Sequence, residues 1–260
     1  MLSPLGEVLA TDRGTLDLAD ADAVRRLVRE ARPQAIVNAA AYTAVDRAES
    51  QRDLAMRVNA LAPGVLAEEA KRLGALLVHY STDYVFDGEK RSPYLEADAP
   101  NPVSYYGVTK LGGELAISAS GCRHLVLRTS WVYGPRASNF YQLIRRKAAA
   151  NEAMLMVDDQ ISVPTPSAFV AAHTVALIRK QAAGLLHLVP SGQATRHEFA
   201  LEVVRSMKSG STVEAVPSDR FPSDARRPRY SAMSNANAAR ALGQALPDWR
   251  TLLAMNRELA

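Results

Sequence analysis

Residues 75–84 read Ala75-Leu76-Leu77-Val78-His79-Tyr80-Ser81-Thr82-Asp83-Tyr84, an apolar run that ends in polar side chains. A short continuous apolar run of this kind is typical of a strand that is buried on both faces. The polar end then lies at the carboxyl end of that strand, which is the edge where open α/β sheets hold their ligands. The segment therefore predicts a buried strand that carries a hydroxyl group to a binding site.

Helical and strand patterns alternate on both sides of this segment. The expected strands are 7–12, 35–38 and 124–128, and the expected helices begin at residues 20, 46 and 107. Repeated alternation of this kind implies a parallel sheet that is covered by helices on both faces. We therefore predict an α/β protein with a Rossmann-like, doubly wound parallel sheet.

The alternation becomes less regular beyond about residue 135, where prolines such as Pro217, Pro222 and Pro228 interrupt the chain. We predict a dinucleotide-binding domain over residues 1–158. Residues 159–260 are expected to form mainly a smaller substrate-binding lobe, partly interwoven with that domain.

The composition is that of an ordinary globular protein, with 260 residues, 48% hydrophobic and 22% charged. No apolar stretch approaches the roughly 20 residues that cross a bilayer, and no secretion signal is evident, so we expect no membrane contact. Cys122 is the single cysteine, which favours a reducing, cytoplasmic setting. A net charge of +4 without a basic, aromatic-rich stripe argues against nucleic-acid binding.

Tyr106 and Lys110 lie four residues apart in Tyr105-Tyr106-Gly107-Val108-Thr109-Lys110. On a helix this spacing places both side chains on one face. An ammonium group beside a phenol favours the phenolate and lowers the pKa of the phenol, which suits a proton donor to a carbonyl oxygen. The pattern also occurs by chance, as a buried tyrosine and a lysine on an ordinary helix.

Several further segments follow in order along nearly the whole chain. They are Asn38-Ala39-Ala40-Ala41-Tyr42-Thr43-Ala44-Val45-Asp46, Val58-Asn59-Ala60, Ser81-Thr82-Asp83-Tyr84-Val85-Phe86, residues 106–110, 128–134 and 159–165, and Arg227-Pro228. With these segments the chain resembles the extended short-chain dehydrogenase/reductases, and within them the dTDP-4-dehydrorhamnose reductase family. The resemblance implies NAD(P)H-dependent reduction of the C4 keto group of dTDP-4-dehydro-6-deoxy-L-mannose, which gives dTDP-L-rhamnose.

The resemblance also implies roles for individual residues. Tyr106 is the expected proton donor, Lys110 would lower its pKa and bind the nicotinamide ribose, and Thr82 would polarise the carbonyl. The expected cofactor-binding residues form three groups along the chain. Before the first expected helix they are Asp12, Arg13, Asp17 and Leu18; after the expected strand 35–38 they are Ala39, Ala40, Ala41 and Thr43; and the third group is the pair Tyr106 and Lys110. An acid beside a basic residue at positions 12 and 13 leaves NADH and NADPH both open.

The expected substrate-binding residues are Thr82, Asp83, Tyr84, Trp131, Asn139 and Arg227. Trp131 could equally be a core residue, and Arg227 could equally belong to a solvated charged face. The histidines show no ligand spacing, and Ser167-Ala168 stands where some relatives carry an acidic metal ligand, so we expect no metal. A homodimer is a further possibility that the resemblance raises.

The sequence departs from the family at its start. The family opens with a strand and a Gly-x-x-Gly-x-x-Gly turn, whose amides meet the dinucleotide pyrophosphate, and Gly6 and Gly14 fit no such pattern. We therefore expect an N-terminally incomplete sequence, or else a truncation that impairs cofactor binding. Two other functions stay open: a nucleotide-sugar epimerase of the same superfamily, and a non-catalytic binding subunit like the regulatory partner of methionine adenosyltransferase.

Overall fold

A four-stranded parallel sheet forms the centre of the computed structural model, which describes residues 2–136 and 139–255. Its order is β1 (Ala35–Asn38), β2 (Leu76–Thr82), β3 (His124–Thr129) and β8 (Gly184–His187). The register sets Asn38 opposite His79, and Thr82 opposite Thr129. The expected strand that leads to Thr82 is confirmed, and all four strands end at the same edge of the sheet.

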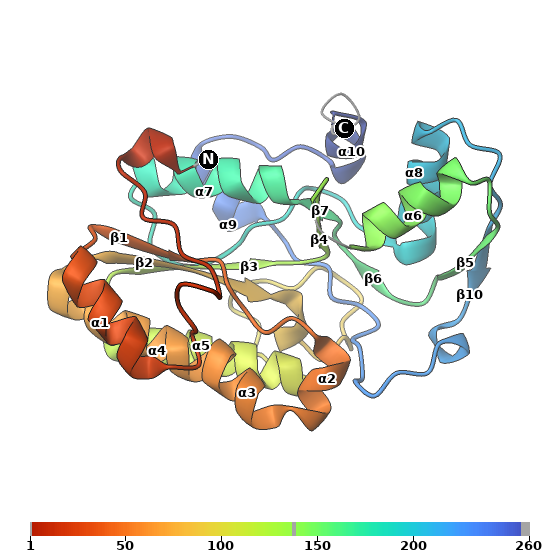
Figure 1. Ribbon diagram of the computed structural model, residues 1–260. Coiled ribbons are helices and arrows are strands. Elements are labelled where there is room, and N and C mark those ends of the chain that lie inside the picture. Colours follow the sequence, from red (N-terminus) through yellow and green to blue (C-terminus); the bar gives the residue numbers. More distant parts are fainter. Residues whose placement is uncertain (1, 137–138, 256–260) are drawn as a thin grey trace.

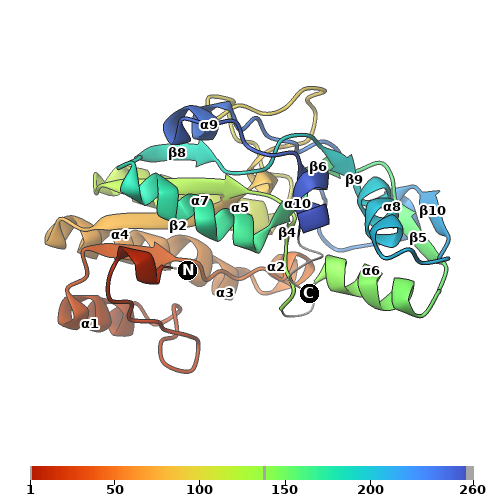
Figure 2. The ribbon, with the colours of Figure 1, turned by 90° about the horizontal axis from the view of Figure 1, so that it is seen from above.

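Helices cover both faces of this sheet, as the buried character of its strands requires. Helices α1 (Ala21–Ala31), α4 (Ala62–Leu73) and α5 (Tyr105–Ser120) lie below it in Figure 1, and α7 (Ser167–Arg179) and α9 (Ala236–Leu242) lie above it. Figure 2, which is a view from above, shows α7 in front of the strands and α9 beside β8. Two apolar clusters fill these layers, one around Leu77 and Val126 and the other around Val78 and Leu127. The predicted doubly wound α/β architecture is confirmed.

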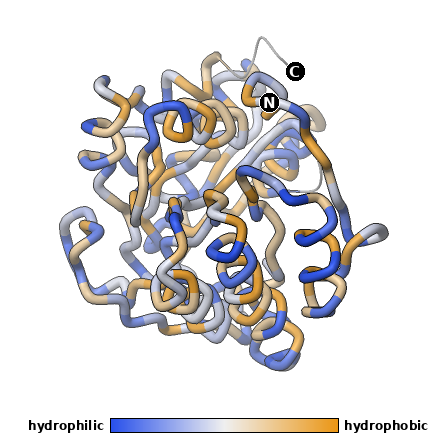
Figure 3. The backbone as a smooth tube through the Cα atoms, turned by 90° about the vertical axis from the view of Figure 1, so that its left-hand side faces the viewer, coloured by the Kyte–Doolittle hydropathy of each residue, from blue (hydrophilic) through white to orange (hydrophobic). Residues whose placement is uncertain are grey.

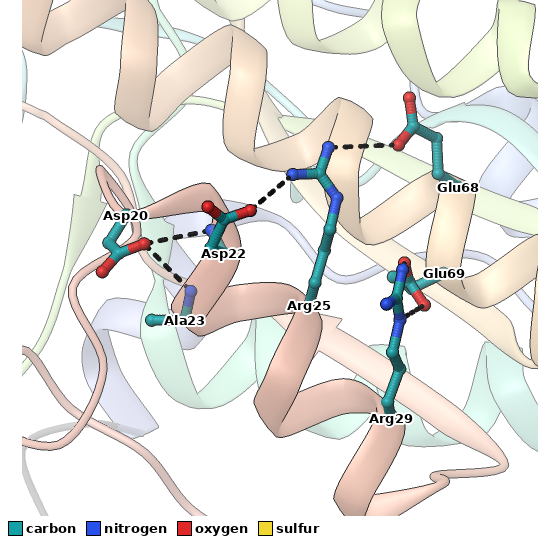
Figure 4. A network of polar contacts seen from close by, with 7 residues as sticks. All are labelled: Asp20, Asp22, Ala23, Arg25, Arg29, Glu68 and Glu69. Carbon is teal, nitrogen blue, oxygen red and sulfur yellow. Dashed lines mark hydrogen bonds and ion pairs between the residues drawn. The ribbon is translucent and has the colours of Figure 1, made fainter.

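Ion pairs join helices α1 and α4, which lie on the lower face of the sheet in Figure 1 (Figure 4). Arg29 of α1 donates to both carboxylate oxygens of Glu69 on α4, over 2.9 and 2.6 Å. Arg25 reaches Asp22 at 3.2 Å and Glu68 at 3.5 Å. The Asp20 side chain caps α1 by accepting the amides of Asp22 and Ala23. Alternating apolar and polar positions on such surface helices appear as alternating orange and blue in Figure 3.

The helical stretch expected over residues 46–73 is divided into shorter pieces. These are α2 (Val45–Ser50), α3 (Arg52–Met56), the π-helical turn η2 (Arg57–Leu61) and α4. Gln51, with φ −103° and ψ 47°, separates α2 from α3. Pro63 has no N–H to donate within the helix, and η2 occupies the turn that precedes it.

The strand expected over residues 7–12 is wrong, because this segment has no regular structure. Val8 and Leu9 are exposed by 46% and 65%. A strand is stable only where its N–H and C=O groups find a partner strand. Within the described residues β1 pairs with β2 alone, and residues 7–12 pair with no strand. Among residues 2–20, the short 3₁₀ turn η1 (Ser3–Leu5) is the only element that the structure describes before α1.

Another apolar cluster, beyond β3 and separate from the two around the sheet, supports the smaller lobe. Helices α6 (Phe140–Ala149), α8 (Arg196–Ser206) and α10 (Trp249–Met255) surround Phe199 and Trp249, beside the parallel pair β5 (Met154–Val157) and β10 (Val213–Val216). Two short strand pairs and one 3₁₀ turn belong to the connections: β4 (Val132–Tyr133) with β7 (Thr165–Pro166), β6 (Ile161–Ser162) with β9 (Ala194–Thr195), and η4 (Ser218–Arg220). The division at residue 158 stays a prediction, and apolar packing crosses it in both directions.

Candidate active site

The start of α5 lies unusually close to the turn that follows β2. A Cβ atom on Gly107 would stand 2.2 Å from the Tyr84 carbonyl oxygen, so only glycine permits this approach. The Tyr84 and Tyr106 rings meet edge to face, with centroids 5.8 Å apart. The turn η3 (Asp83–Val85) and the first turn of α5 therefore form one wall, and Tyr106 is part of it.

Thr82 ends β2 and is buried, and its hydroxyl group is close enough to that of Tyr106 to influence the pKa of the phenol. Its Oγ1 accepts the Tyr84 amide at 3.1 Å and donates to Asp83 Oδ1 at 3.1 Å. The structure thus brings together the two hydroxyl groups that the sequence selects. Two converging hydroxyl groups are the donors that a carbonyl oxygen gaining negative charge requires.

Lys110 does not act on Tyr106 in the expected way. Its Nζ donates to the Tyr80 carbonyl oxygen at 2.6 Å and contacts His79 Nε2 at 3.2 Å. Burial, opposed by the Thr82 hydrogen bond, raises the pKa of Tyr106 well above its ordinary value. The predicted lowering of the Tyr106 pKa by Lys110 is therefore wrong for this structure, because desolvation dominates and the ammonium group points into the sheet.

Asp83 is buried among hydroxyl groups. Its Oδ2 accepts from Ser162 at 2.9 Å and from Ser231 at 2.5 Å, while Oδ1 accepts from Thr82. Burial raises the pKa of this carboxyl group, and the hydroxyl donors oppose that shift. Asp83 therefore connects the end of β2 to two distant segments, and its expected contact with substrate stays a prediction.

A cavity of about 830 Å³ lies on the smaller-lobe side of this wall. It is lined by residues of α6, β5 and α8 and by residues 218–229, and both Arg196 and Arg227 contribute to it. Both arginines also interact with the Tyr84 hydroxyl. Tyr84 therefore stands between Tyr106 on one side and two guanidinium groups on the other.

The two arginines differ in their partners. Arg227 forms a two-pronged ion pair with Asp46 of α2, over 3.2 and 2.7 Å. Arg196 has no carboxylate partner among the described residues, and its Nε contacts Gln160 Oε1 at 3.4 Å. Its guanidinium lies 4.6 Å from the Trp131 ring centroid and 5.2 Å from that of Phe140. A partly buried cation without a counter-ion makes this end of the cavity suited to an anion.

Trp131 has φ 40°, a left-handed conformation that a bulky residue rarely adopts. Its carbonyl oxygen accepts the Thr165 amide at 3.2 Å, which anchors the turn to β7. The strained backbone directs the indole against Arg196. Asn139, in contrast, uses its side chain to cap α6 and to donate to the Gly134 carbonyl oxygen, and its expected contact with substrate stays a prediction.

The expected cofactor residues fall into two places. Asp12, Arg13 and Asp17 occupy exposed turns in which the Asp12 side chain accepts the Gly14 and Thr15 amides, while Leu18 packs beside α1 and α4. The second place follows β1, where Ala39, Ala40 and Thr43 are exposed and Ala41 is partly buried. Their roles toward a cofactor stay predictions.

The sequence did not single out Arg196, His79 or Asn38 as functional residues. Arg196 follows Thr195, the first residue of a capping box. This pattern indicates where a helix begins, but it does not predict where the arginine side chain points. His79 lies within an apolar run, and Asn38 ends another. A polar side chain inside a run expected to be buried is the signal that could have identified these two residues, because it needs a partner.

The fold and the two hydroxyl groups at the end of β2 define a Rossmann-like protein of the dehydrogenase/reductase class. The chain belongs to the family described as the RmlD substrate binding domain, whose model matches residues 1–258. It is 42% identical to dTDP-4-dehydrorhamnose reductase of Burkholderia thailandensis, over 96% of this chain and 89% of the relative. It is 39% identical to the enzyme of the same name from Escherichia coli K12, over 96% and 88%.

Solved structures show the same relationship. The structure of dTDP-4-dehydrorhamnose reductase of Bacillus anthracis in complex with NADP superimposes on this chain with a TM-score of 0.93. The two are 32% identical, over 98% of this chain and 90% of that one. The ortholog from Clostridium acetobutylicum gives 0.92 at 34% identity, over 97% and 90%. A UDP-glucose 4-epimerase of Thermotoga maritima gives 0.81 at 18% identity, which shows a common fold alone.

Proposed function

We propose that this protein reduces the C4 keto group of dTDP-4-dehydro-6-deoxy-L-mannose to give dTDP-L-rhamnose. Family membership and the names of its relatives support the reaction and the substrate. The single observation that carries the proposal is the convergence of the Thr82 and Tyr106 hydroxyl groups at the end of β2. Each can donate a hydrogen bond to the oxygen of a ketone that lies between them.

Tyr106 serves as the proton donor. Because burial raises its pKa, the phenol keeps its proton until the ketone oxygen becomes a strongly basic alkoxide. The proton then passes from the Tyr106 hydroxyl to that oxygen, which leaves a phenolate that Thr82 stabilises by donating a hydrogen bond. Thr82 has a single proton, which is donated to Asp83 in this structure, so it must turn first to the ketone oxygen and, after the proton transfer, to the phenolate.

The residues of this chain fit the nicotinamide half of a dinucleotide. Ala39 and Ala40 are exposed at the end of β1 and carry only methyl groups, so their backbone can be approached closely. Lys110 lies beyond the adjacent strand with its ammonium group on the Tyr80 carbonyl oxygen. When bound, the reduced nicotinamide supplies the hydride that adds to C4. The NADP complex of the Bacillus anthracis relative supports the same cofactor here.

The cavity is proposed to hold the nucleotide part of the substrate. Arg196 and Arg227 at its edge would bind the diphosphate, with Tyr84 between them and the sugar. Trp131, held against Arg196, would form an apolar wall for the deoxysugar. The single cysteine favours a reducing, cytoplasmic setting, and a homodimer is part of the proposal. No helix among the described residues is long and apolar enough to span a membrane.

The test is incubation of the purified protein with NADPH and the ketosugar, followed by the absorbance of reduced nicotinamide. We expect consumption of NADPH in proportion to the dTDP-L-rhamnose formed. An epimerase would give a new sugar with no net consumption of NADPH. If the assay gives no new sugar and no consumption of NADPH, the proposal is contradicted, and a binding subunit is the remaining candidate.

A further inference from the structure

His79 is a buried histidine in the middle of the site that the reaction outlined above does not use. It is 1% exposed, lies on β2 three residues before Thr82, and contacts a polar side chain through each ring nitrogen. Its Nδ1 lies 3.1 Å from Asn38 Nδ2, and its Nε2 lies 3.2 Å from Lys110 Nζ. The ring therefore joins the end of β1 to α5 through the interior of the sheet.

Asn38 determines which ring nitrogen carries the proton. Its Oδ1 accepts the Ala40 amide at 3.3 Å, which orients the side-chain amide so that Nδ2 faces the imidazole. An amide nitrogen can only donate, so His79 Nδ1 must accept. Burial holds the pKa of His79 well below its ordinary value, so the ring is neutral and its single proton lies on Nε2.

The Nε2 proton points at Lys110, and this contact favours one protonation state of the lysine over the other. An ammonium group has three donors and no acceptor, so it places a donor against a donor at this contact. A neutral amine can accept from Nε2–H and still donate to the Tyr80 carbonyl oxygen. Only the neutral amine therefore leaves each of these three groups with a suitable partner.

We propose that His79 is a positioning residue that sets the protonation equilibrium of Lys110, acting as the Nε2–H tautomer that Asn38 selects. The inference deepens the proposed function, since Lys110 is the lysine of the proposed reductase site. Lys110 then exchanges a proton near neutral pH instead of remaining a permanent cation. Asn38, His79 and Lys110 form a line of hydrogen bonds whose polarity is fixed from the Ala40 amide onward.

The other charged groups around Lys110 do not replace this effect. Glu114, one helical turn further along α5, raises the pKa of Lys110, but it is engaged by Arg128 of β3 in a two-pronged ion pair. Glu49 of α2 accepts the Tyr105 amide, and Asp83 of η3 is held by hydroxyl groups. Burial is the largest effect and lowers the pKa of Lys110 to about 8. Glu114 raises the value from the one that burial alone would give, and the contact with His79 Nε2 is the feature that we propose lowers it.

The tautomer can be observed directly. In protein labelled with ¹⁵N-histidine, the His79 ring signals are assigned by their loss in His79→Leu. We expect a protonated Nε2 and an unprotonated Nδ1. A proton on Nδ1 would overturn the proposal. This measurement needs neither substrate nor nucleotide, so a failure of the proposed reductase activity leaves it unaffected.

The sign of a titration shift gives the second test. With ¹³C-lysine labelling, the Lys110 signal should titrate near pH 8, and its midpoint should rise by about one unit in His79→Leu, because the neutral amine loses a donor. Asn38→Asp should also raise the midpoint, since a carboxylate accepts from Nδ1–H and turns Nε2 into an acceptor for the ammonium group. A midpoint that falls or stays unchanged in both variants would contradict the proposal.

His187→Leu is the matched control. His187 is also buried and neutral, on β8, and burial lowers its pKa to about 3. It has no contact with Lys110, so the Lys110 midpoint should not move in this variant. An equal shift in His187→Leu would show that any loss of a buried imidazole perturbs the lysine, and it would overturn the specific role of His79.

Discussion

Replacing Arg196 by methionine tests the anion site at the edge of the cavity. The change removes the charge and the donors of the guanidinium but keeps an unbranched apolar side chain between Trp131 and Phe140. Because no carboxylate neutralises Arg196 among the described residues, its charge is available to a phosphate group. We therefore expect weaker binding of dTDP and unchanged binding of thymidine, which has no phosphate.

The size of the effect follows from the partners of Arg196. A hydrogen bond to a charged group contributes about 1.5–3 kcal/mol. One tenfold change in affinity corresponds to about 1.4 kcal/mol, so dTDP should bind about ten- to a hundredfold more weakly to Arg196→Met. The stacking of Arg196 on two rings should influence the free energy of unfolding instead, and it should affect both ligands equally.

Isothermal titration calorimetry gives the dissociation constants of both ligands. Arg226→Met is the matched control, because Arg226 also lines the cavity but is exposed, and its charge is screened by solvent. We expect the ratio of the dTDP and thymidine affinities to change less than about threefold in that control. If Arg196→Met keeps the wild-type ratio, Arg196 does not bind the diphosphate and the cavity has another use.

Three further outcomes are expected. Tyr106→Phe should lower kcat by about 10²–10⁴ with little change in the dissociation constant of dTDP, measured by NADPH oxidation and calorimetry; near wild-type turnover would contradict its role. Glu114→Gln should lower the free energy of unfolding by about 3–5 kcal/mol in denaturant titrations, because Arg128 is left buried without its counter-charge, and a loss below 1 kcal/mol would show that water reaches the pair. For Asp83, whose pKa is raised in the folded state, ionisation favours unfolding. As the pH rises above about 4, where the unfolded carboxyl group ionises, the stability of the wild type should therefore fall relative to Asp83→Asn, and the opposite slope would refute the burial effect.

The strands of the sheet could be predicted because an apolar run leaves a clear mark in sequence, both in the buried central strand β2 and in the edge strand β1, whose Ile36 and Val37 are only half-buried. Ile36 and Val37 are apolar, and so are Leu76, Leu77 and Val78, and each run ends at a polar residue. The strand expected over residues 7–12 has the same local pattern. It fails because strand formation depends on a neighbour, and the identity of the neighbour is not a local property of the chain.

The position of Thr82 and Tyr106 was predictable for a different reason. The end of a parallel strand and the first turn of a helix are fixed by regular geometry, and Gly107 permits the close approach of the two segments. The environment of Tyr106 was not predictable. The four-residue spacing places Lys110 on a known face of the helix, but the long lysine side chain can select among several partners, and here it selects the Tyr80 carbonyl oxygen.

Arg196 illustrates the limit of the sequence more sharply. Many basic residues of this chain stand beside acidic ones, and nothing local distinguishes an arginine that has a counter-ion from one that does not. The contrast with Arg227 appears only when α2 and residues 218–229 are placed together, because Asp46 then engages Arg227 and leaves Arg196 as the cation without a carboxylate.

Tyr84 lies between a cationic region and Tyr106. Its ring edge meets Tyr106, and its hydroxyl group interacts with Arg196 and Arg227, so it separates these cations from the proposed proton donor. A substrate with a diphosphate at one end and a ketone at the other can satisfy both regions at once. The diphosphate then neutralises the guanidinium groups, while the ketone oxygen lies between two hydroxyl groups in a dry environment. Since Tyr106 holds its proton firmly there, hydride transfer and proton transfer are tied to the same bound molecule.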